Sequence, residues 1–354
     1  MPRTPAYAAV SARSALAPFW VERREPGPDD VLIDILYCGV CHSDIHQVRD
    51  EWGGSTFPMV PGHEIVGRVV KIGTQVTRFR MGDTVGVGCF VDSCRHCQAC
   101  AAGEEQFCEH GMSATYNGFE RNGIELDRSR PTYGGYSGRI TVDQHYVLHV
   151  PAGIPLERTA PLLCAGITTY SPLRHYAVKA GDQVAIVGLG GLGHMGVKLA
   201  KAMGAQVTVL SHSTSKHDDA LHLGADDFIA TGDADVFNTH AGRFDLILDT
   251  VSAPHDYNAY LSLLSLDGTM VLLGLPDPTP LAAGSLIRRR RRLAGSMIGG
   301  IRQTQEMLDF CAGHGVAADV EVIDIAQINT AYQRMLQGDV RYRFVIDLAT
   351  LQDD

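Results

Sequence analysis

Four cysteines within a short segment constrain this 354-residue chain more than any other feature, namely Cys94, Cys97, Cys100 and Cys108. Their spacing, Cys-x2-Cys-x2-Cys-x7-Cys, suits a closed tetrahedral zinc site that staples a lobe with little core of its own. An iron–sulfur cluster also uses four thiolates, but the last spacing and the lack of a following proline do not match the bacterial ferredoxin pattern. Disulfides are rare in cytosolic chains. We therefore predict a structural zinc site.

A second group of metal-ligating residue types lies in the segment 38–67. Cys41 and His63 provide a thiol and an imidazole, which are typical zinc ligands. Cys164, an isolated thiol among apolar and small residues, is the best remaining candidate for a third ligand. Three protein ligands leave one tetrahedral position for water or substrate, as in catalytic zinc sites. Taken singly, these residues also fit a buried core, and only their combination favours a metal site.

The residues around these ligands indicate proton transfer. Ser43 follows Cys41 by two positions, so its hydroxyl can reach an oxygen at the metal, and His46 can pass the proton on to solvent. Asp44 and Glu64 directly follow relay or ligand residues, where carboxylates orient imidazoles and tune a metal. We therefore predict Ser43 and His46 as catalytic residues.

Composition narrows the class of protein. The length favours two domains, and 45% hydrophobic with 20% charged residues is typical of a globular protein. A net charge of −10 argues against a nucleic-acid partner, despite the arginine run at 288–292. Neither a signal peptide nor a run of about eighteen apolar residues is found. We expect a cytoplasmic location and no membrane association.

The chain changes character near residue 153. Before it, short strand patterns such as 31–37 and 65–73 indicate a closed or partly open antiparallel β structure. After it, strands alternate with helices, which predicts a doubly wound parallel sheet. We place a β-rich catalytic domain at 1–153, a cofactor domain at 154–292 and a segment that completes the catalytic domain at 293–354.

A glycine-rich turn opens the second region. Gly188, Gly190 and Gly193 form a GxGxxG pattern between an apolar strand run at 183–187 and an apolar helix pattern. In this context the glycines allow a tight turn and close approach of a pyrophosphate to the helix N-terminus. We include Gly191 and Leu192 among the cofactor contacts. A glycine-rich turn without a ligand is the alternative.

The end of the next strand predicts the type of dinucleotide. An NAD site places an acidic residue about twenty residues beyond the glycines, where it binds the ribose 2′-hydroxyl. Hydroxyls and an ammonium stand there instead, which suit a 2′-phosphate and favour NADP(H) over NAD(H); a polar loop without a ligand is the alternative. The residues are Ser211, His212, Ser213 and Lys216. Thr250, Val251 and Gly274 stand at or just beyond two further strand ends, where such sheets bind ligands.

The ordered motifs resemble the zinc-dependent medium-chain alcohol dehydrogenases. They are C-G-V-C-H-S-D, P-G-H-E-I-V-G, the four spaced cysteines, P-L-L-C-A-G-I-T-T-Y and G-L-G-G-L-G-H. The segments D-E-W-G, V-D-S-C and A-G-S-M-I-G-G-I-R-Q-T-Q-E-M-L-D-F are similar to those of the cinnamyl alcohol dehydrogenase group of NADP-dependent aldehyde reductases. The resemblance covers essentially the whole chain.

This resemblance implies a GroES-like catalytic domain, a Rossmann cofactor domain and two zinc ions per chain. It implies that Cys41, His63 and Cys164 bind the catalytic zinc, with Glu64 beside it or as a transient ligand, and that the four spaced cysteines bind the other ion. Thr168 and Ser296 join the cofactor contacts, and Ser43 with His46 relays the proton. Members commonly pair through their cofactor domains, which implies a homodimer, with a tetramer as the alternative.

The implied reaction is reversible hydride transfer between NADP(H) and a small-molecule aldehyde or primary alcohol, aromatic or medium-chain. An NAD-dependent polyol or simple alcohol dehydrogenase of the same fold is the first alternative. A non-catalytic cofactor-binding zinc protein and a nucleic-acid-associated zinc protein are further alternatives. An apolar pocket lining favours aromatic or medium-chain substrates over sugars. Candidate lining residues, which ordinary packing explains equally well, are Trp52, Met59, Cys89 and Ile298.

Overall fold

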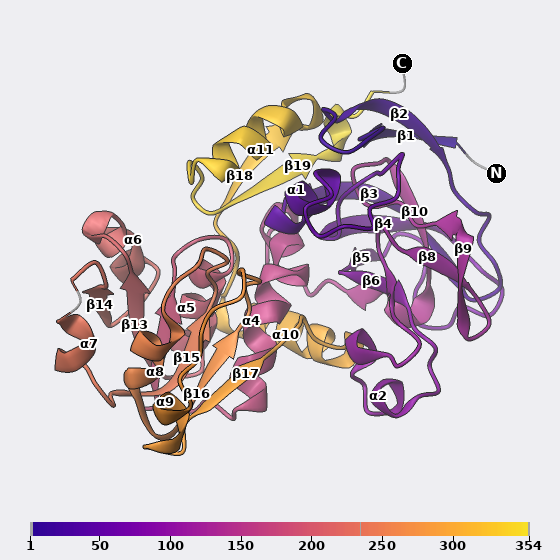
Figure 1. The fold of residues 1–354 in the computed structure, drawn as a ribbon. Helices are drawn as coiled ribbons and strands as arrows, with labels where there is room; N and C mark the ends of the chain where they lie inside the picture. Colours follow the sequence, from indigo (N-terminus) through magenta and orange to yellow (C-terminus); the bar gives the residue numbers. More distant parts are fainter. Residues whose placement is uncertain (1–2, 234, 353–354) are drawn as a thin grey trace. The chain divides into compact units, whose positions relative to one another are not determined.

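The computed structural model describes residues 3–233 and 235–352, and it divides into two compact units. The first unit comprises residues 1–164 and 299–354, and the second comprises residues 165–298 (Figure 1). The domain limits derived from the sequence, at residues 153 and 292, stay a prediction. Within the described residues, no helix is both long and apolar enough to cross a membrane.

The first unit is built on a seven-stranded sheet. Its path runs β11-β5-β4-β3-β19-β18, and β10 also pairs with β3. The strands are β3 (Asp30–Gly39), β4 (Ile65–Ile72), β5 (Thr84–Val87), β10 (Arg139–Asp143), β11 (Leu148–His149), β18 (Val320–Asp324) and β19 (Arg343–Asp347). Because β3 is rich in Val, Ile and Leu and is largely buried, it is suited to the centre of this sheet.

The C-terminal segment contributes two strands to this sheet. β19 pairs antiparallel with the end of β3, where Val345 lies opposite Gly39, and β18 runs parallel to β19. Residues more than 300 positions apart therefore meet at one end of β3.

Three small antiparallel pairs and several short helices complete the first unit. The pairs are β1 (Arg3–Ala8) with β2 (Ala17–Glu22), β6 (Phe90–Asp92) with β7 (Ser113–Ala114), and β8 (Phe119–Asn122) with β9 (Glu125–Pro131). The helices are α1 (His42–Val48), α2 (Gln98–Ala101), α3 (Leu156–Thr159), α10 (Ile301–His314) and α11 (Ile328–Leu336).

The second unit is a six-stranded parallel sheet in the order β14-β13-β12-β15-β16-β17. The strands are β12 (Gln183–Val187), β13 (Gln206–Ser211), β14 (Asp227–Ala230), β15 (Phe244–Asp249), β16 (Leu264–Leu272) and β17 (Arg292–Gly295). Numbered within the unit, this is the order 3-2-1-4-5-6 of the Rossmann fold. The predicted α/β class, a β-rich unit plus a doubly wound parallel sheet, is confirmed.

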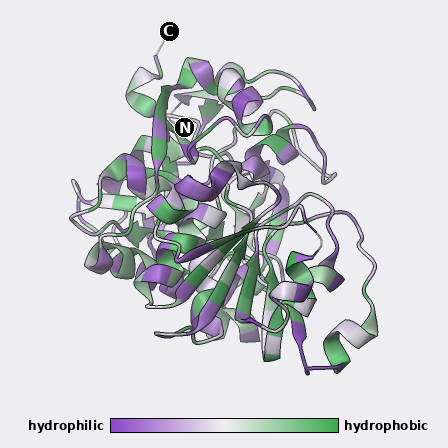
Figure 2. Ribbon diagram, turned by 90° about the vertical axis from the view of Figure 1, so that its left-hand side faces the viewer, coloured by the Kyte–Doolittle hydropathy of each residue, from purple (hydrophilic) through white to green (hydrophobic). Residues whose placement is uncertain are grey.

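Helices flank the strands of the second unit. They are α4 (Ala165–His175), α5 (Gly193–Ala202), α6 (His217–His222), α7 (Val236–Thr239), α8 (Tyr257–Ser262) and α9 (Ala283–Ile287). Figure 2 shows the strands of this sheet coloured mainly as hydrophobic. One core cluster includes the fully buried Phe244, Ile247 and Met270. Because parallel strands are covered on both faces, they read as continuous apolar runs.

Two local expectations can be compared with the structure, and one of them differs from it. The sequence pattern predicts a strand from Thr269 to Gly274, whereas β16 begins at Leu264 and ends at Leu272. The arginine run in an acidic chain suggests a solvated connector, and Arg288, Arg289, Arg290 and Arg292 are exposed. Arg291 is half-buried and donates hydrogen bonds to the carbonyls of Ser262 and Leu264. Arg291 therefore lies against β16, and the run leads directly into β17.

Candidate functional site

Antiparallel pairing of β3 with β4 builds one corner of the first metal-ligating cluster. Cys38 at the end of β3 lies opposite Ile65 at the start of β4, and the Gly39 amide donates to the Glu64 carbonyl over 2.9 Å. Cys41 lies two residues after the end of β3 and is the N-cap of α1, while His63 and Glu64 directly precede β4. Residues that are distant in sequence are thus placed at one sheet edge.

Cys164 completes this cluster from a short 3-10 turn at Ala160–Leu163. The potential ligand atoms of Cys41, His63, Glu64 and Cys164 all lie within 4.8 Å of one another, and all four residues are buried. The two sulfur atoms are 4.0 Å apart. Two thiolates on one tetrahedral zinc lie about 3.8 Å apart, given zinc–sulfur bonds of about 2.3 Å. The spacing of these thiols therefore fits a shared zinc ion.

The sulfur atoms of this cluster share their protons unequally. The hydrogen bond between them lowers the pKa of Cys41 well below its usual value and raises that of Cys164 well above it. One thiolate therefore forms readily, whereas the second needs an added positive charge. This proton balance is what a dication at the centre of the cluster would supply.

Asp44 fixes the imidazole and the start of α1. Its Oδ1 lies 3.2 Å from Nδ1 of His63, and its Oδ2 accepts from the Cys41 amide over 2.8 Å and from the Tyr136 hydroxyl over 3.1 Å. Burial lowers the pKa of His63, but the Asp44 carboxylate, together with Cys89 and Cys41, raises that pKa well above the usual value. With Nδ1 held by Asp44, Nε2 is the nitrogen available to a metal. The prediction that Asp44 orients an imidazole agrees with this geometry.

Glu64 carries the clearest sign of a missing partner. It is fully buried, and its Oε1 pairs with the Arg343 guanidinium on β19. Among the residues that the structure describes, none forms a hydrogen bond with its Oε2. Burial raises the pKa of Glu64 to about 8, although Arg343 acts in the opposite direction. An orphaned carboxylate oxygen beside two thiols and an imidazole fits a bound cation.

Arg343 is the functional residue that sequence reasoning missed. Besides pairing with Glu64, it lies with Nη1 3.8 Å from the Cys41 sulfur, and its side chain is buried. It stands 302 positions from Cys41, in a strand that the sequence identified only as apolar. No local motif marks it. Only the pairing of β19 with β3 shows where this arginine lies.

The predicted relay residues lie on α1, at different depths. The hydroxyl of Ser43 is 3.6 Å from the Cys41 sulfur, so Ser43 belongs to the cluster. His46 is partly exposed, its Nδ1 lies 2.5 Å from Oε2 of Glu51, and its ring stacks on Trp52. Within the described residues, no hydrogen bond joins Ser43 to His46 directly. Their roles stay a prediction.

The four spaced cysteines form a second cluster in the same unit. The sulfur atoms of Cys94, Cys97, Cys100 and Cys108 lie within 4.8 Å of one another. Backbone amides point at them: Cys94 donates to the Cys108 sulfur over 3.3 Å, and Cys97 to the Cys94 sulfur over 3.4 Å. Backbone hydrogen bonds lower the pKa of Cys97 to about 6. This local cluster contains only cysteines, which suits a lobe that a metal holds together.

The three pattern glycines of the second unit each have a distinct physical reason. Gly188 has a φ of 84°, and a Cβ on it would lie 2.7 Å from Val251. A Cβ on Gly193 would lie 2.1 Å from the Gly188 carbonyl oxygen. A Cβ on Gly190, in contrast, would meet nothing within 4 Å, so the turn is open where a phosphate would approach.

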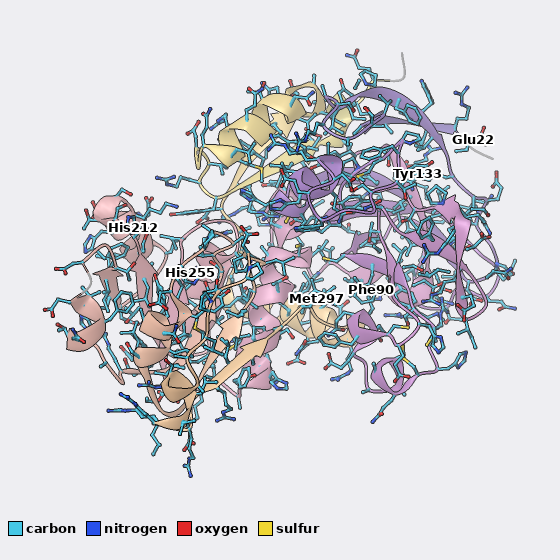
Figure 3. All side chains as sticks on the ribbon, in the orientation of Figure 1. Glu22, Phe90, Tyr133, His212, His255 and Met297 are labelled. Atoms are coloured by element: carbon cyan, nitrogen blue, oxygen red, sulfur yellow. The ribbon has the colours of Figure 1, made fainter. Side chains whose placement is uncertain are left out.

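The predicted cofactor residues gather at the carboxyl edge of the parallel sheet. Strands β12, β13, β15, β16 and β17 each end at or just before one of these residues. Thr168, in contrast, lies on α4. Lys216 donates from Nζ to the Leu189 carbonyl over 2.8 Å, which ties the loop after β13 to the glycine turn. Figure 3 labels His212, the residue after β13. The residues at this edge are Gly188, Gly190, Gly191, Leu192, Ser211, His212, Ser213, Lys216, Thr250, Val251, Gly274 and Ser296.

Comparison with known proteins decides the family. The "Alcohol dehydrogenase GroES-like domain" profile matches residues 27–152, and the "Zinc-binding dehydrogenase" profile matches residues 191–313. The "NADP-dependent alcohol dehydrogenase C 1" of Mycolicibacterium smegmatis is 57% identical over 349 residues, which is 98% of each chain. The chain belongs to the zinc-binding alcohol dehydrogenase family. The family-level resemblance seen in the sequence is thereby confirmed.

Solved structures agree with this membership. A cinnamyl alcohol dehydrogenase from Sorghum bicolor superimposes with a TM-score of 0.96 at 45% identity and covers 100% of this chain and 99% of its own. A structure of CAD from Helicobacter pylori, complexed with NADP(H), has a TM-score of 0.91 at 40% identity and covers 99% of each chain. Both cysteine-containing clusters of this chain offer the sulfur and nitrogen donors that zinc prefers. This agrees with membership of a zinc-binding family.

Proposed function

We propose that this alcohol dehydrogenase interconverts aldehydes and primary alcohols with NADP(H), and that it acts on aromatic or medium-chain substrates. The observation that carries the proposal is the buried cluster of two thiols and one imidazole with an orphaned Glu64 oxygen beside it. The names of similar proteins support the reaction: one is an NADP-dependent alcohol dehydrogenase and another a cinnamyl alcohol dehydrogenase.

In this proposal, Cys41, His63 and Cys164 hold the catalytic zinc. When bound, the ion supplies Lewis-acid polarisation of the substrate oxygen. Asp44 holds the imidazole in the tautomer that leaves Nε2 free to bind. Arg343 lies beside the Glu64 carboxyl and the Cys41 sulfur and stabilises the ionised form of each. These residues set the charge of the site before any substrate arrives.

Proton transfer is assigned to α1. In this proposal, the Ser43 hydroxyl exchanges a proton with a substrate oxygen at the cluster, and its position beside the Cys41 sulfur supports the role. His46, at the more exposed end of the helix, receives or supplies that proton. Since no direct hydrogen bond joins these two side chains among the described residues, a water or another hydroxyl group that is not the reacting oxygen bridges them in this proposal.

The cofactor is assigned to the carboxyl edge of the parallel sheet. The glycine turn at 188–193 accommodates the pyrophosphate, and the hydride comes from the nicotinamide. Ser211, His212, Ser213 and Lys216 bind the 2′-phosphate, because this loop offers hydroxyls and an ammonium where an NAD site has a carboxylate. The NADP(H) in the structure of the Helicobacter pylori protein supports this choice.

The remaining assignments follow from the family. Cys94, Cys97, Cys100 and Cys108 bind the structural zinc. The active form is a homodimer in the cytoplasm, with a tetramer as the alternative. A negative net charge of −10 supports the absence of a nucleic-acid partner.

Cofactor oxidation with an aromatic aldehyde, measured with NADPH and NADH in parallel, tests the function. Fast turnover with NADPH alone is the expected result. Turnover with NADH alone would contradict the 2′-phosphate assignment, and turnover with neither cofactor would contradict the reaction itself. Running a polyol with NADP+ and NAD+ in the same assay separates the aldehyde reductase from a polyol dehydrogenase.

A further inference from the structure

A histidine and a buried aspartate face each other where β15 leads into α8. Asp249, the last residue of β15, is 1% exposed. His255 lies six residues later, in the connection to α8 (Figure 3), and its Nε2 is 2.9 Å from Oδ2 of Asp249. The zinc clusters and the predicted contacts include neither residue.

The partners of the imidazole determine its protonation. Nδ1 of His255 lies 2.9 Å from the carbonyl oxygen of Ala253, which can only accept a hydrogen bond, so Nδ1 carries a proton. Nε2 faces the Asp249 carboxylate, which accepts when it is ionised. Two acceptors at the two ring nitrogens require a proton on each. The pair is therefore an imidazolium with a carboxylate.

The surroundings agree with this charge state. Burial lowers the pKa of His255, but Asp249, the Ala253 carbonyl and Asp256 together raise it above the usual value. The groups that face the ring are Asp249 on β15, Asp256 at the N-cap of α8, and the rings of Tyr257 and Tyr260 on α8, which meet it edge-on. A buried carboxylate needs such a partner, since an unpaired buried charge is costly.

Asp249 in turn fixes the loop at the nucleotide edge. Its Oδ1 accepts from the Val251 amide over 3.1 Å, and its carbonyl accepts from Leu273 over 2.9 Å. The Val251 side chain occupies the space beside Gly188, the first glycine of the dinucleotide turn. The carbonyl oxygen of Val251 lies beside Gly274, where an added Cβ would be 2.4 Å from it. Any shift of Asp249 therefore moves the residue that packs against the glycine turn.

We propose that His255 is a positioning residue of the cofactor site: as the counter-ion of Asp249, it holds residues 250–254 in the arrangement that receives the dinucleotide. This inference rests on the proposed function, because it needs a dinucleotide at the carboxyl edge of the sheet. Among the described residues, the hydrogen bonds and ring contacts of His255 are with Asp249, Ala253, Tyr257 and Tyr260. His255 acts through Asp249 and Val251.

The proposal predicts a pH dependence with a defined sign. Below the usual histidine pKa of about 6.5, His255 is protonated, so its ion pair with Asp249 is fully formed. It is lost as pH rises through the raised pKa of the folded protein, because a neutral ring then turns a lone pair toward the carboxylate. In a His255→Gln variant, the side-chain amide keeps an uncharged N–H donor at the position of Nε2. A His255→Leu variant has no donor there.

The test measures NADPH dissociation constants of the two-zinc holoenzyme by fluorescence titration between pH 6 and pH 9, for wild type, His255→Gln and His255→Leu. Dividing each variant's constant by the wild-type value cancels the titration of the cofactor. At pH 6, His255→Leu is expected to bind about tenfold more weakly, as the loss of a charge-assisted hydrogen bond implies, and the ratio falls as pH rises. His255→Gln is expected to stay within about threefold of wild type, since it keeps one neutral hydrogen bond.

Controls separate positioning from general stability. His145→Gln disrupts an exposed histidine–aspartate pair in the other unit and is expected to leave NADPH binding unchanged. In steady-state assays, the loss in His255→Leu is expected in the KM for NADPH and not in the KM for the aldehyde. If His255→Leu does not fold, the pH profile of His255→Gln relative to wild type decides: a ratio independent of pH overturns the proposal.

The outcomes also distinguish this inference from the function on which it rests. Wild-type protein that binds NADPH, together with a His255→Leu variant that binds it equally well at pH 6, overturns only the positioning role. Wild-type protein that binds only NADH overturns the 2′-phosphate assignment, and the same titrations with NADH then decide the role of His255. Binding of neither cofactor overturns both proposals.

Discussion

At the residue scale, the candidate catalytic cluster depends on balanced buried charge. Glu64 and Arg343 are both almost fully buried, and each is the other's partner. Removing one partner from such a pair leaves an uncompensated charge, which costs far more than the pair contributes. The same arginine also lies beside the Cys41 sulfur, so it affects the ligand thiolate directly.

Replacing Arg343 by methionine is therefore expected to destabilise the fold by about 3–5 kcal/mol. The measurement is the free energy of unfolding in denaturant, accompanied by zinc content. Arg334→Met provides the control, because Arg334 pairs with Glu321 in a partly exposed position and its loss is expected to have little effect. If the two variants unfold at the same denaturant concentration, Arg343 does not have the role assigned to it.

Ser43 offers a second test at this scale. Ser43→Ala is expected to lower turnover about 100-fold, which is the range for loss of a general acid–base group, without lowering zinc content. Ser43→Thr keeps the hydroxyl and is expected to retain most of the activity. Unchanged turnover in the alanine variant would remove Ser43 from the proton path.

At the element scale, local motifs and long-range pairing differ in what the sequence reveals. The glycine turn is predictable because β12, the turn and α5 are contiguous, and each glycine has a local steric reason. The cysteine lobe is predictable for the same reason. Arg343 is not, because its place depends on the pairing of β19 with β3 across some 300 residues. His255 escapes sequence reasoning because its importance depends on a buried carboxylate, and burial of one aspartate is not visible in a strand pattern.

The segment that contains Cys94, Cys97, Cys100 and Cys108, called the cysteine lobe here, allows a test of the structural zinc site. Cys97→Ser is expected to remove one zinc per chain and to raise amide hydrogen exchange in residues 93–112, because the lobe's local cluster consists of cysteines alone. Exchange in strands of the parallel sheet, such as β12 and β15, is expected to stay slow. Cys311→Ala is the control, since Cys311 is buried outside both clusters. Equal exchange in the lobe of both variants would contradict a structural metal there.

At the scale of the whole molecule, the chemistry is divided between two units. Both candidate metal clusters lie in the first unit, and the dinucleotide edge lies in the second. The change in sequence pattern after residue 153 indicates two regions of different type, although a boundary there would assign Cys164 to the cofactor domain and not to the unit that holds the other zinc-ligand candidates. The sequence does not predict the identity of the substrate, because the shape of a substrate pocket depends on side chains from many separate segments.

The central claim is that Cys41, His63 and Cys164 hold a catalytic metal, and zinc content per chain tests it most directly. We would measure it by elemental mass spectrometry in wild type and Cys164→Ser, with Cys311→Ala as a thiol-loss control. The account predicts two zinc ions in wild type and in the control, and one in Cys164→Ser, with aldehyde reduction abolished only in that variant. Two zinc ions and full activity in Cys164→Ser would contradict it.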